Sequence, residues 1–322
     1  MLRLAHVNLN DAKKIFEDMM KYIYPYFADF DYCSNALNTT VYPICLDFTL
    51  KASKKYYFPL DGQGLPVRNY SSVGRQYNPT RIAAFGLAHY NNYILTKDKN
   101  SLSRFLKVAE WFQRSPDGIW RYEFDWGTLK APWISAMAQG EGISVLTRAW
   151  YLTGETIYLE RAIAALAPFT KEISQGGVLS KIDGLDPFLE EYPDDKPVHV
   201  LNGFLYAVIG MVDLERIAQI DLPLEMSAKD WLSILERHLS KWDLGYWSAY
   251  DLSGLNSSLR NASTVSYHRL HIAQLKFLGE WSNSRVLLNT ADSWYQYLRK
   301  LSNRLKAMSV KVRYRMKVRA QR

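Results

Sequence analysis

A weak internal repeat constrains the fold of this chain more than any other feature of its sequence. The segment LTKDKNSLSRF, which begins at Leu95, aligns with LTGETIYLERA, which begins at Leu152, at an offset of 57 residues. In each copy an apolar pattern of helical spacing leads through a short polar turn into a second helical pattern. A glycine-led extended piece follows each pair, at Gly118 and at Gly177. The repeat therefore predicts a mainly α fold that is assembled from helix pairs.

Helical periodicity extends well beyond the two copies. About eight helices can be counted from Asn78 to Lys306, and a third glycine-led piece occurs at Gly245. Helix pairs whose connecting loops carry small hairpins are typical of an α/α toroid, in which the pairs surround a central axis. A solenoid of stacked pairs would give the same pattern and is the structural alternative. We expect the toroid, which is an α/α barrel.

The charge is divided unevenly along the chain. The net charge is +8, but residues 299–322 hold ten Lys or Arg and no acidic residue, so the remaining 298 residues carry 30 basic and 32 acidic side chains. A charged tail is most often solvated and mobile, and binding to a polyanion or an acidic membrane surface is the alternative. We expect an N-terminal helix and strand/loop segment at 1–77, the α/α-barrel domain at 78–298 and a basic tail at 299–322. An early helix is predicted from Asn10 to about Phe30.

The two cysteines, Cys33 and Cys45, form neither a disulfide framework nor a metal-site spacing. They are interpreted as two buried thiols in a reducing compartment, with a single bridge as the alternative. The N-terminal residues lack the apolar stretch of a signal peptide. No apolar run is long enough to span a bilayer. These observations predict a cytoplasmic protein without an integral membrane segment.

The chain lacks the common cofactor and nucleophile motifs. It contains no GxGxxG, P-loop, HExxH or GxSxG sequence. The glycines of QGEG, residues 139–142, lie inside a helical pattern, which favours close helix packing over a phosphate cradle. His268 and His271 share a helix face, but no third metal ligand lies near them in the sequence. We therefore predict no metal site, no cofactor and no nucleic-acid partner.

Acids and phenols recur in the loops between the helix pairs. The candidates are Tyr122, Glu123, Asp125, Glu190, Glu191, Tyr192, Tyr250, Asp251, Tyr267, His268 and His271. Taken singly, each is an ordinary loop residue. In a toroid, however, loops that occupy equivalent positions in successive helix pairs lie at the same end of the barrel. This arrangement favours a common site. Tyr192 precedes a proline and is therefore expected in an extended loop rather than in a helix.

Several blocks, in the same order along the chain, resemble the C-terminal domain of the D-glucuronyl C5-epimerases. These blocks are SAMAQG, EEYP followed by VLNGF, and YDLSG followed by SYHRLH, within a resemblance from about Gln76 to about Leu278. Members of this family convert D-glucuronate to L-iduronate within heparosan-type polysaccharides, the precursors of glycosaminoglycans such as heparan sulfate. The resemblance implies an α/α barrel and an isomerase that acts on an anionic uronate-containing polysaccharide. It also allows a homodimer, since relatives tend to be dimers.

The resemblance also implies specific site residues. It places reactive tyrosines at Tyr192, Tyr250 and Tyr267, with Glu191 beside the first. It places the substrate-binding residues Tyr122, Trp133, Gln139 and Asn202 in or near a sugar cleft. Ser253 stands where the family commonly has an arginine, and Arg260 or Arg269 is expected to substitute for it. His271 is expected to orient one of the reactive groups.

The chemistry of inversion supports these roles. A hydrogen α to a carboxylate is very weakly acidic, so its removal requires a positioned base and a partner that stabilises the enediolate. Inversion further requires one group on each face of the sugar ring. Tyrosine is neutral at its ordinary pKa of about 10, so it suits proton donation, whereas Glu191 is ready to act as a base. We expect Tyr267 to oppose Glu191 or Tyr192, with Tyr250 as a hydrogen-bonding partner.

Three other functions are compatible with the same residues. A polysaccharide lyase shares the first step but then expels the 4-linked sugar. A glycoside hydrolase would use two carboxylates, Asp125 or Asp186 together with Glu191. A non-catalytic saccharide-binding protein would bind uronate without exchanging hydrogen with solvent.

Overall fold

The computed structural model describes residues 19–25, 30–51, 55–255 and 259–317. Within them the chain forms four successive helix pairs. These are α3 (Pro79–Thr96) with α4 (Lys99–Gln113), α5 (Ala136–Thr153) with α6 (Thr156–Ala164), α7 (Leu201–Asp213) with α8 (Ala228–His238), and α9 (Val265–Ser282) with α10 (Arg285–Arg299). Of the early helix predicted from Asn10 to Phe30, residues 19–23 are helical, and the part before residue 19 lies outside the described residues.

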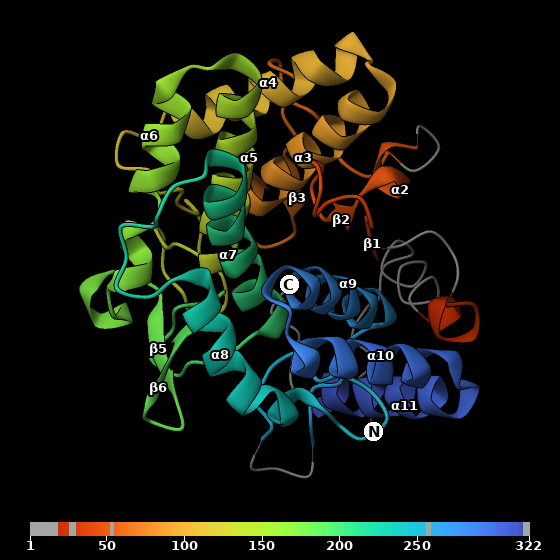
Figure 1. The fold of residues 1–322 in the computed structure, drawn as a ribbon. Coiled ribbons are helices and arrows are strands. Elements are labelled where there is room, and N and C mark those ends of the chain that lie inside the picture. The colour runs from red at the N-terminus through yellow and green to blue at the C-terminus, as the bar shows by residue number, and fades with distance from the viewer. Residues whose placement is uncertain (1–18, 26–29, 52–54, 256–258, 318–322) are drawn as a thin grey trace.

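The first helices of the four pairs form an inner row, in which α3 packs on α5, α5 on α7 and α7 on α9. Their partners α4, α6, α8 and α10 lie on the outside of this row (Figure 1). Between α9 and α3 the gap is filled by β1 (Asp31–Tyr32), β2 (Ile44–Cys45) and α2 (Asp47–Leu50). The ring of inner helices is thus closed by the N-terminal segment. This arrangement confirms the predicted mainly α toroid of helix pairs rather than an open solenoid.

Local sequence signals explain where the inner helices begin and end. The Asn78 side chain caps α3 by accepting a hydrogen bond from the backbone of Arg81, and Pro79 occupies the first helical position. Thr264 caps α9 in the same way. At its other end α5 stops at Gly154, whose φ of 73° is the left-handed conformation that glycine adopts without strain. The side-chain caps at Asn78 and Thr264 thus define where α3 and α9 begin.

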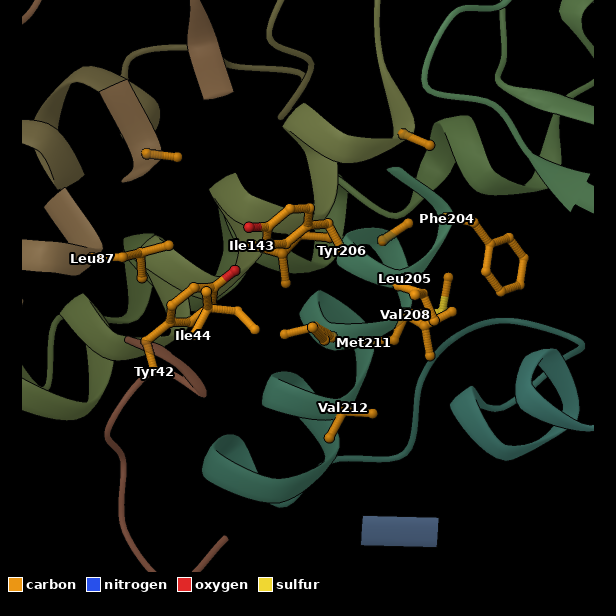
Figure 2. Packing of buried hydrophobic residues seen from close by; sticks show 14 of the residues in the cluster. Tyr42, Ile44, Leu87, Ile143, Phe204, Leu205, Tyr206, Val208, Met211 and Val212 are labelled. Atoms are coloured by element: carbon orange, nitrogen blue, oxygen red, sulfur yellow. The ribbon is translucent and has the colours of Figure 1, made fainter. Parts of the chain in front are cut away.

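The core is centred on α7, all of whose residues are buried. Figure 2 shows Phe204, Met211 and other side chains of α7 packed among residues of neighbouring elements. Helices α5 and α7 approach each other closely at two glycines. A Cβ on Gly140 would lie 2.2 Å from the carbonyl oxygen of Tyr206, and one on Gly210 would lie 2.4 Å from that of Gly140. Gly140 of QGEG therefore permits the close helix packing that the sequence predicted, whereas Gly142 leaves room for the ring of Trp120.

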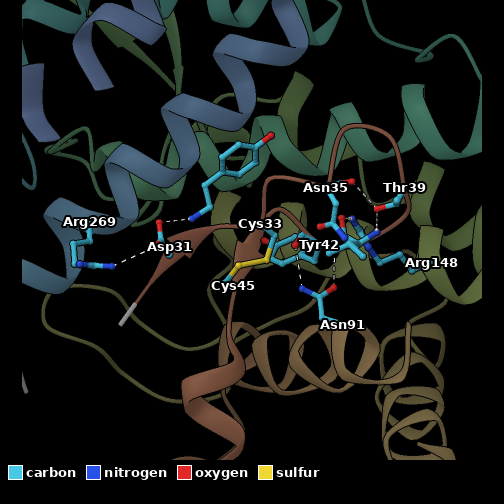
Figure 3. Close-up of a disulfide and its surroundings, with 11 residues drawn as sticks. Asp31, Cys33, Asn35, Thr39, Tyr42, Cys45, Asn91, Arg148 and Arg269 are labelled. Atoms are coloured by element: carbon cyan, nitrogen blue, oxygen red, sulfur yellow. Dashed lines mark hydrogen bonds and ion pairs between the residues drawn. A yellow bond between two sulfur atoms is a disulfide. The ribbon is translucent and has the colours of Figure 1, made fainter. Parts of the chain in front are cut away.

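The N-terminal segment is tied to the ring by buried contacts (Figure 3). Arg148 of α5 has no exposed side-chain surface, and its guanidinium binds the Asp213 carboxylate at 2.5 and 3.0 Å while donating to the Thr40 carbonyl. Cys33 and Cys45 form a disulfide with an S–S distance of 2.09 Å. The prediction of two free thiols is therefore wrong. The two residues are brought together because β1 and β2 pair antiparallel.

Two further hairpins and several short turns complete the described fold. The hairpins are β3 (Arg68–Tyr70) with β4 (Gly74–Gln76), and β5 (Leu179–Ile182) with β6 (Asp186–Leu189). The short helical turns are η2 (Ala167–Thr170), η3 (Ile173–Gln175), η4 (Leu214–Ala218) and η5 (Leu239–Trp242). No helix within the described residues has both the length and the apolar character that crossing a membrane would require.

The basic tail is helical over most of its length. Residues Leu301–Lys317 form helix α11, which packs on α10. Arg304 is 7% exposed, and its guanidinium donates hydrogen bonds to the carbonyl oxygens of Tyr22, Leu298 and Arg299. The prediction of a mobile tail is wrong here because Arg304 and Ala307 form a buried face that charge counting does not reveal.

Candidate active site

The predicted reactive residues lie where the inner helices begin. Glu191 and Tyr192 belong to the loop between β6 and α7, and Tyr250 belongs to the loop before α9. Tyr267 is in the first turn of α9, and Trp133 lies just before α5. The structure thus brings together, at one end of the ring, residues that are far apart in the sequence. We call Glu191, Tyr192, Tyr250 and Tyr267 the carboxylate–tyrosine cluster.

An aromatic wall borders the cluster. Tyr122 and Trp133 pair through two backbone hydrogen bonds, and their rings stack at a centroid distance of 3.9 Å with an interplanar angle of 6°. The Trp133 ring lies 6.1 Å from the ring of Tyr192. Tyr70 of β3 adds to the wall by packing against Phe124 at 4.9 Å. Rigid aromatic faces of this kind suit contact with the apolar face of a sugar ring.

The two adjacent glutamates have different surroundings. Glu190 is fully buried, and its carboxylate accepts hydrogen bonds from the Ser180 hydroxyl at 2.6 Å and from the His199 backbone at 3.2 Å. The Nδ1 atom of His199 lies 2.6 Å from the same carboxylate. Glu190 therefore fastens the loop to the β5–β6 hairpin and to the segment before α7. This anchoring leaves Glu191 at the opposite side of the loop, in the cluster.

Glu191 is held close against the start of α7. Asn202 donates a hydrogen bond from Nδ2 to Glu191 Oε2 at 3.2 Å. The next residue is Gly203, where a Cβ would lie 2.5 Å from the Cβ of Glu191 and 2.8 Å from Oε2. Burial raises the pKa of Glu191 to about 7, although hydrogen bonds from Tyr192 and Asn202 oppose the shift. This carboxyl can therefore exchange a proton near neutral pH.

The phenols of the cluster remain protonated at that pH. The rings of Tyr250 and Tyr267 are 4.9 Å apart and meet edge to face. Burial, and then the nearby charge of Glu191, raise the pKa values of Tyr192, Tyr250 and Tyr267 above the usual range. Tyr267 is nevertheless 36% exposed. The cluster thus combines one carboxyl that ionises near neutrality with neutral phenols, one of which solvent can reach.

Three residues expected in the site lie elsewhere. Gln139 is fully buried, and its amide binds the backbone of Gly118, Trp120 and Ala165, so it braces the loop after α4 instead of facing a sugar. Arg269 donates to the carbonyl oxygens of Pro25 and Phe30 in the N-terminal segment.

His271 is buried, with Nδ1 lying 3.0 Å from the Ser248 hydroxyl and its ring beside Trp294 of α10. Its described contacts therefore hold α9 to α10 and to the loop that contains Ser248. They do not orient a tyrosine of the cluster.

The structure also places residues of α11, which the sequence did not indicate, beside the cluster through Asp251. Asp251 follows Tyr250 and accepts hydrogen bonds from Ser253 at 2.6 Å and from Asn261 at 2.7 Å. Lys311 of α11 donates to Asn261 at 2.7 Å. The α11 residues Arg304, Ala307, Lys311 and Tyr314 recur at spacings of three, four and three, so helical periodicity was the signal that could have revealed this face.

The predicted substitutes for the arginine at position 253 are both engaged elsewhere. Arg260 donates a hydrogen bond to the carbonyl oxygen of Lys241, and Arg269 binds the N-terminal segment. Among the described residues, no group of three or more His, Cys, Asp or Glu side chains is arranged to hold a metal ion.

Residues 113–296, more than half of the chain, match the family model described as D-glucuronyl C5-epimerase C-terminus. The chain belongs to this family. Among its relatives is a D-glucuronyl C5-epimerase of Caenorhabditis elegans, which is 36% identical over 182 residues. That match covers 52% of this chain but only 29% of the C. elegans epimerase. An uncharacterized protein of Methanocaldococcus jannaschii is 25% identical over 266 residues, which cover 74% of this chain and 84% of that protein.

Solved structures with some likeness to this member of the epimerase family are more distant. A UGL variant with the saccharide dGlcA-Glc-Rha-Glc has a TM-score of 0.47 and 15% identity, over 70% of this chain and 62% of its own. A polysaccharide lyase has a TM-score of 0.39 and 13% identity, over 92% and 84% of the two chains. These likenesses are too weak to indicate a function.

Proposed function

We propose that this chain inverts C5 of D-glucuronate residues in a heparosan-like polysaccharide and so forms L-iduronate. Membership of the epimerase family supports the reaction type. The observation that carries the proposal is the carboxylate–tyrosine cluster, in which Glu191 has a pKa of about 7 and lies among neutral phenols. A base that ionises near neutral pH and a donor that stays protonated are the two groups that inversion requires.

The reaction is a proton transfer at each face of one carbon. In the proposed mechanism, Glu191 removes the hydrogen from C5, and the electron pair of the C–H bond moves into the sugar carboxylate to form an enediolate. Tyr267 then donates its proton to the opposite face of C5, which restores the C–H bond with inverted configuration. Tyr250, whose ring contacts that of Tyr267, stabilises the phenolate that remains by donating a hydrogen bond to it. After the reaction Glu191 returns its proton to solvent and Tyr267 regains one from solvent, to which Tyr267 is partly exposed.

The surrounding structure would stabilise the enediolate. The cluster lies at the N-terminal ends of α7 and α9, close to the start of α5. Each helix N-terminus carries a partial positive charge of about half an elementary charge, which favours an anion. Asn202 positions Glu191, and Trp133 with Tyr192 would contact the sugar face. No cofactor is required for this chemistry.

A two-carboxylate hydrolase receives no support from the positions of the other acids. Asp125 forms an ion pair with Lys130 at 2.7 Å, and Asp186 binds Arg237 at 2.8 Å and His238 at 2.7 Å. Each of these carboxylates is therefore matched with basic side chains outside the cluster.

The test is hydrogen exchange. Protein incubated with heparosan in deuterated water should place deuterium at C5 and produce iduronate signals in NMR spectra. Tyr267→Phe and Glu191→Gln, which remove the proposed donor and the proposed base, should each slow the exchange about 100-fold or more. Tyr151→Phe, which alters an exposed tyrosine of α5, is the matched control and should exchange at the wild-type rate.

Three results would overturn the proposal. The first is a folded protein that places no deuterium in any of a panel of uronate polymers. The second is a wild-type exchange rate in both variants. The third is an unsaturated uronate that absorbs in the ultraviolet, which would identify a lyase.

A further inference from the structure

Helix α11 reaches the edge of the carboxylate–tyrosine cluster. Its first turns are fixed by Arg304, whose guanidinium binds three backbone carbonyls, one of them in the N-terminal segment. Two turns later on the same face lies Lys311, and Tyr314 follows one turn further. The position of Lys311 is thus set by a buried anchor on its own helix. Both residues lie beyond residues 113–296, so the family match assigns them no role.

Lys311 contacts the cluster through two neighbours. Its Nζ atom lies 5.6 Å from the centroid of the Tyr250 ring, a distance at which a cation is attracted to an aromatic face. The same atom donates to Asn261 Oδ1 at 2.7 Å, and Asn261 donates in turn to Asp251 at 2.7 Å. Tyr314 lies 3.1 Å from the Ser253 hydroxyl and holds α11 against this loop.

The negative charges near Tyr250 would repel an anionic ligand, so binding of such a ligand there requires a nearby cation. Glu191 and Asp251 both lie near Tyr250 and act on its phenol as negative charges. A uronate carboxylate placed beside them would be repelled unless a positive charge offset theirs. Arg260 and Arg269 point to backbone carbonyls elsewhere. The ammonium of Lys311 carries a full positive charge, which attracts a ligand carboxylate while the same group holds Asn261.

We propose that Lys311 is a substrate-binding residue that recognises the carboxylate of the uronate ring seated on Tyr250. This inference rests on the proposed function, because it takes a uronate as the ligand of the cluster. It makes α11 part of the binding site. It also assigns to a residue of the C-terminal helix the positive charge that position 253 lacks.

Equilibrium binding tests the inference without requiring turnover. The probes are a heparosan hexasaccharide and the same hexasaccharide with its carboxylates reduced to hydroxymethyl groups, titrated by calorimetry. Lys311→Met should weaken binding of the anionic hexasaccharide about tenfold or more, the loss expected for a charge-assisted hydrogen bond. It should leave the affinity for the reduced hexasaccharide unchanged. Lys311→Arg should restore most of the loss.

Arg313→Met is the matched control, because it removes one cation from an exposed position of the same helix. It should leave both affinities near the wild-type values. Thermal unfolding of each variant verifies that α11 still docks.

The outcomes separate this inference from the proposed function. Equal affinity of wild type and Lys311→Met for the anionic hexasaccharide would refute the role of Lys311, whatever the exchange assay shows. An equal loss for both hexasaccharides would also refute it, because packing rather than charge would then be responsible. Wild-type protein that binds no uronate saccharide refutes it as well. Wild-type protein that binds with the predicted charge dependence but exchanges no hydrogen refutes only the proposed reaction.

Discussion

Replacing Glu191 with glutamine should make the protein more stable at alkaline pH while abolishing hydrogen exchange. The carboxyl is 7% exposed, and its pKa rises from 4.5 to about 7 on folding because burial disfavours the charged form. Since the folded state holds this proton more tightly than the unfolded state, the free energy of unfolding falls as the pH rises from about 4.5 to about 7. A glutamine at this position has no such dependence.

The size of the effect follows from the pKa values. Each pKa unit corresponds to about 1.4 kcal/mol, so the ionised Glu191 destabilises the folded protein by about 3 kcal/mol at pH 8. At pH 5 the folded protein holds the carboxyl protonated, and the penalty is about 1 kcal/mol. Any constant difference between glutamine and glutamic acid cancels when the two pH values are compared. The stability of Glu191→Gln relative to wild type should therefore rise by about 2 to 3 kcal/mol between pH 5 and pH 8.

Urea denaturation of both proteins at the two pH values measures this quantity. Glu123→Gln, at an exposed position next to the aromatic wall, provides the control for removing one carboxylate. It should show no comparable change. A relative stability of Glu191→Gln that is the same at both pH values would refute the proposed burial of a carboxylate ready to act as a base. Undiminished deuterium incorporation would refute its catalytic role.

Two further predictions concern the scaffold. Cys33→Ser should lower the free energy of unfolding by about 3 kcal/mol, because it opens a short disulfide loop; reduction of the wild type with dithiothreitol should give a similar loss in urea denaturation, and no effect of either would contradict the disulfide. Gly203→Ala should slow C5 exchange about tenfold or more, because its Cβ would displace Glu191 from its position. An exchange rate equal to that of the wild type would show that the close approach at Gly203 does not matter.

The helical architecture could be predicted from the sequence because the spacing of apolar residues follows directly from helix geometry. The apolar spacing, the proline at position 79 and Gly140 of QGEG each reflect a local geometry, and the structure has the helix start and the close helix crossing that they predict. The segment before Tyr77, which was expected to mix strands and loops, contains the short pairs β1–β2 and β3–β4. These helices and strands could be predicted because they depend on residues that are close in the sequence or on the burial of apolar side chains.

The partners of polar side chains were less accessible, because they depend on distant segments. Gln139 lies in a matching motif, yet its partners are backbone groups of loops that no local pattern reveals. The position of Arg269, in contrast, could have been predicted from helix geometry. Arg269 follows Tyr267 by two residues, about 200° around the helix, so the two side chains cannot face the same site. The charge of the tail concealed the periodic face that contains Lys311. Composition alone cannot distinguish a solvated tail from an amphipathic helix.

Closure of the ring by the N-terminal segment has a consequence for the order in which the protein folds. The Tyr32 hydroxyl donates to Glu280 across a sequence separation of 248 residues, and Arg269 binds the Phe30 carbonyl across 239. Contacts between such distant residues require the closing of a very long loop, so they form late. During synthesis, the surface of β1 that receives α9 remains uncovered until nearly the whole ring has left the ribosome. The interval before α9 emerges is therefore the stage at which this chain is most exposed to misassembly and aggregation.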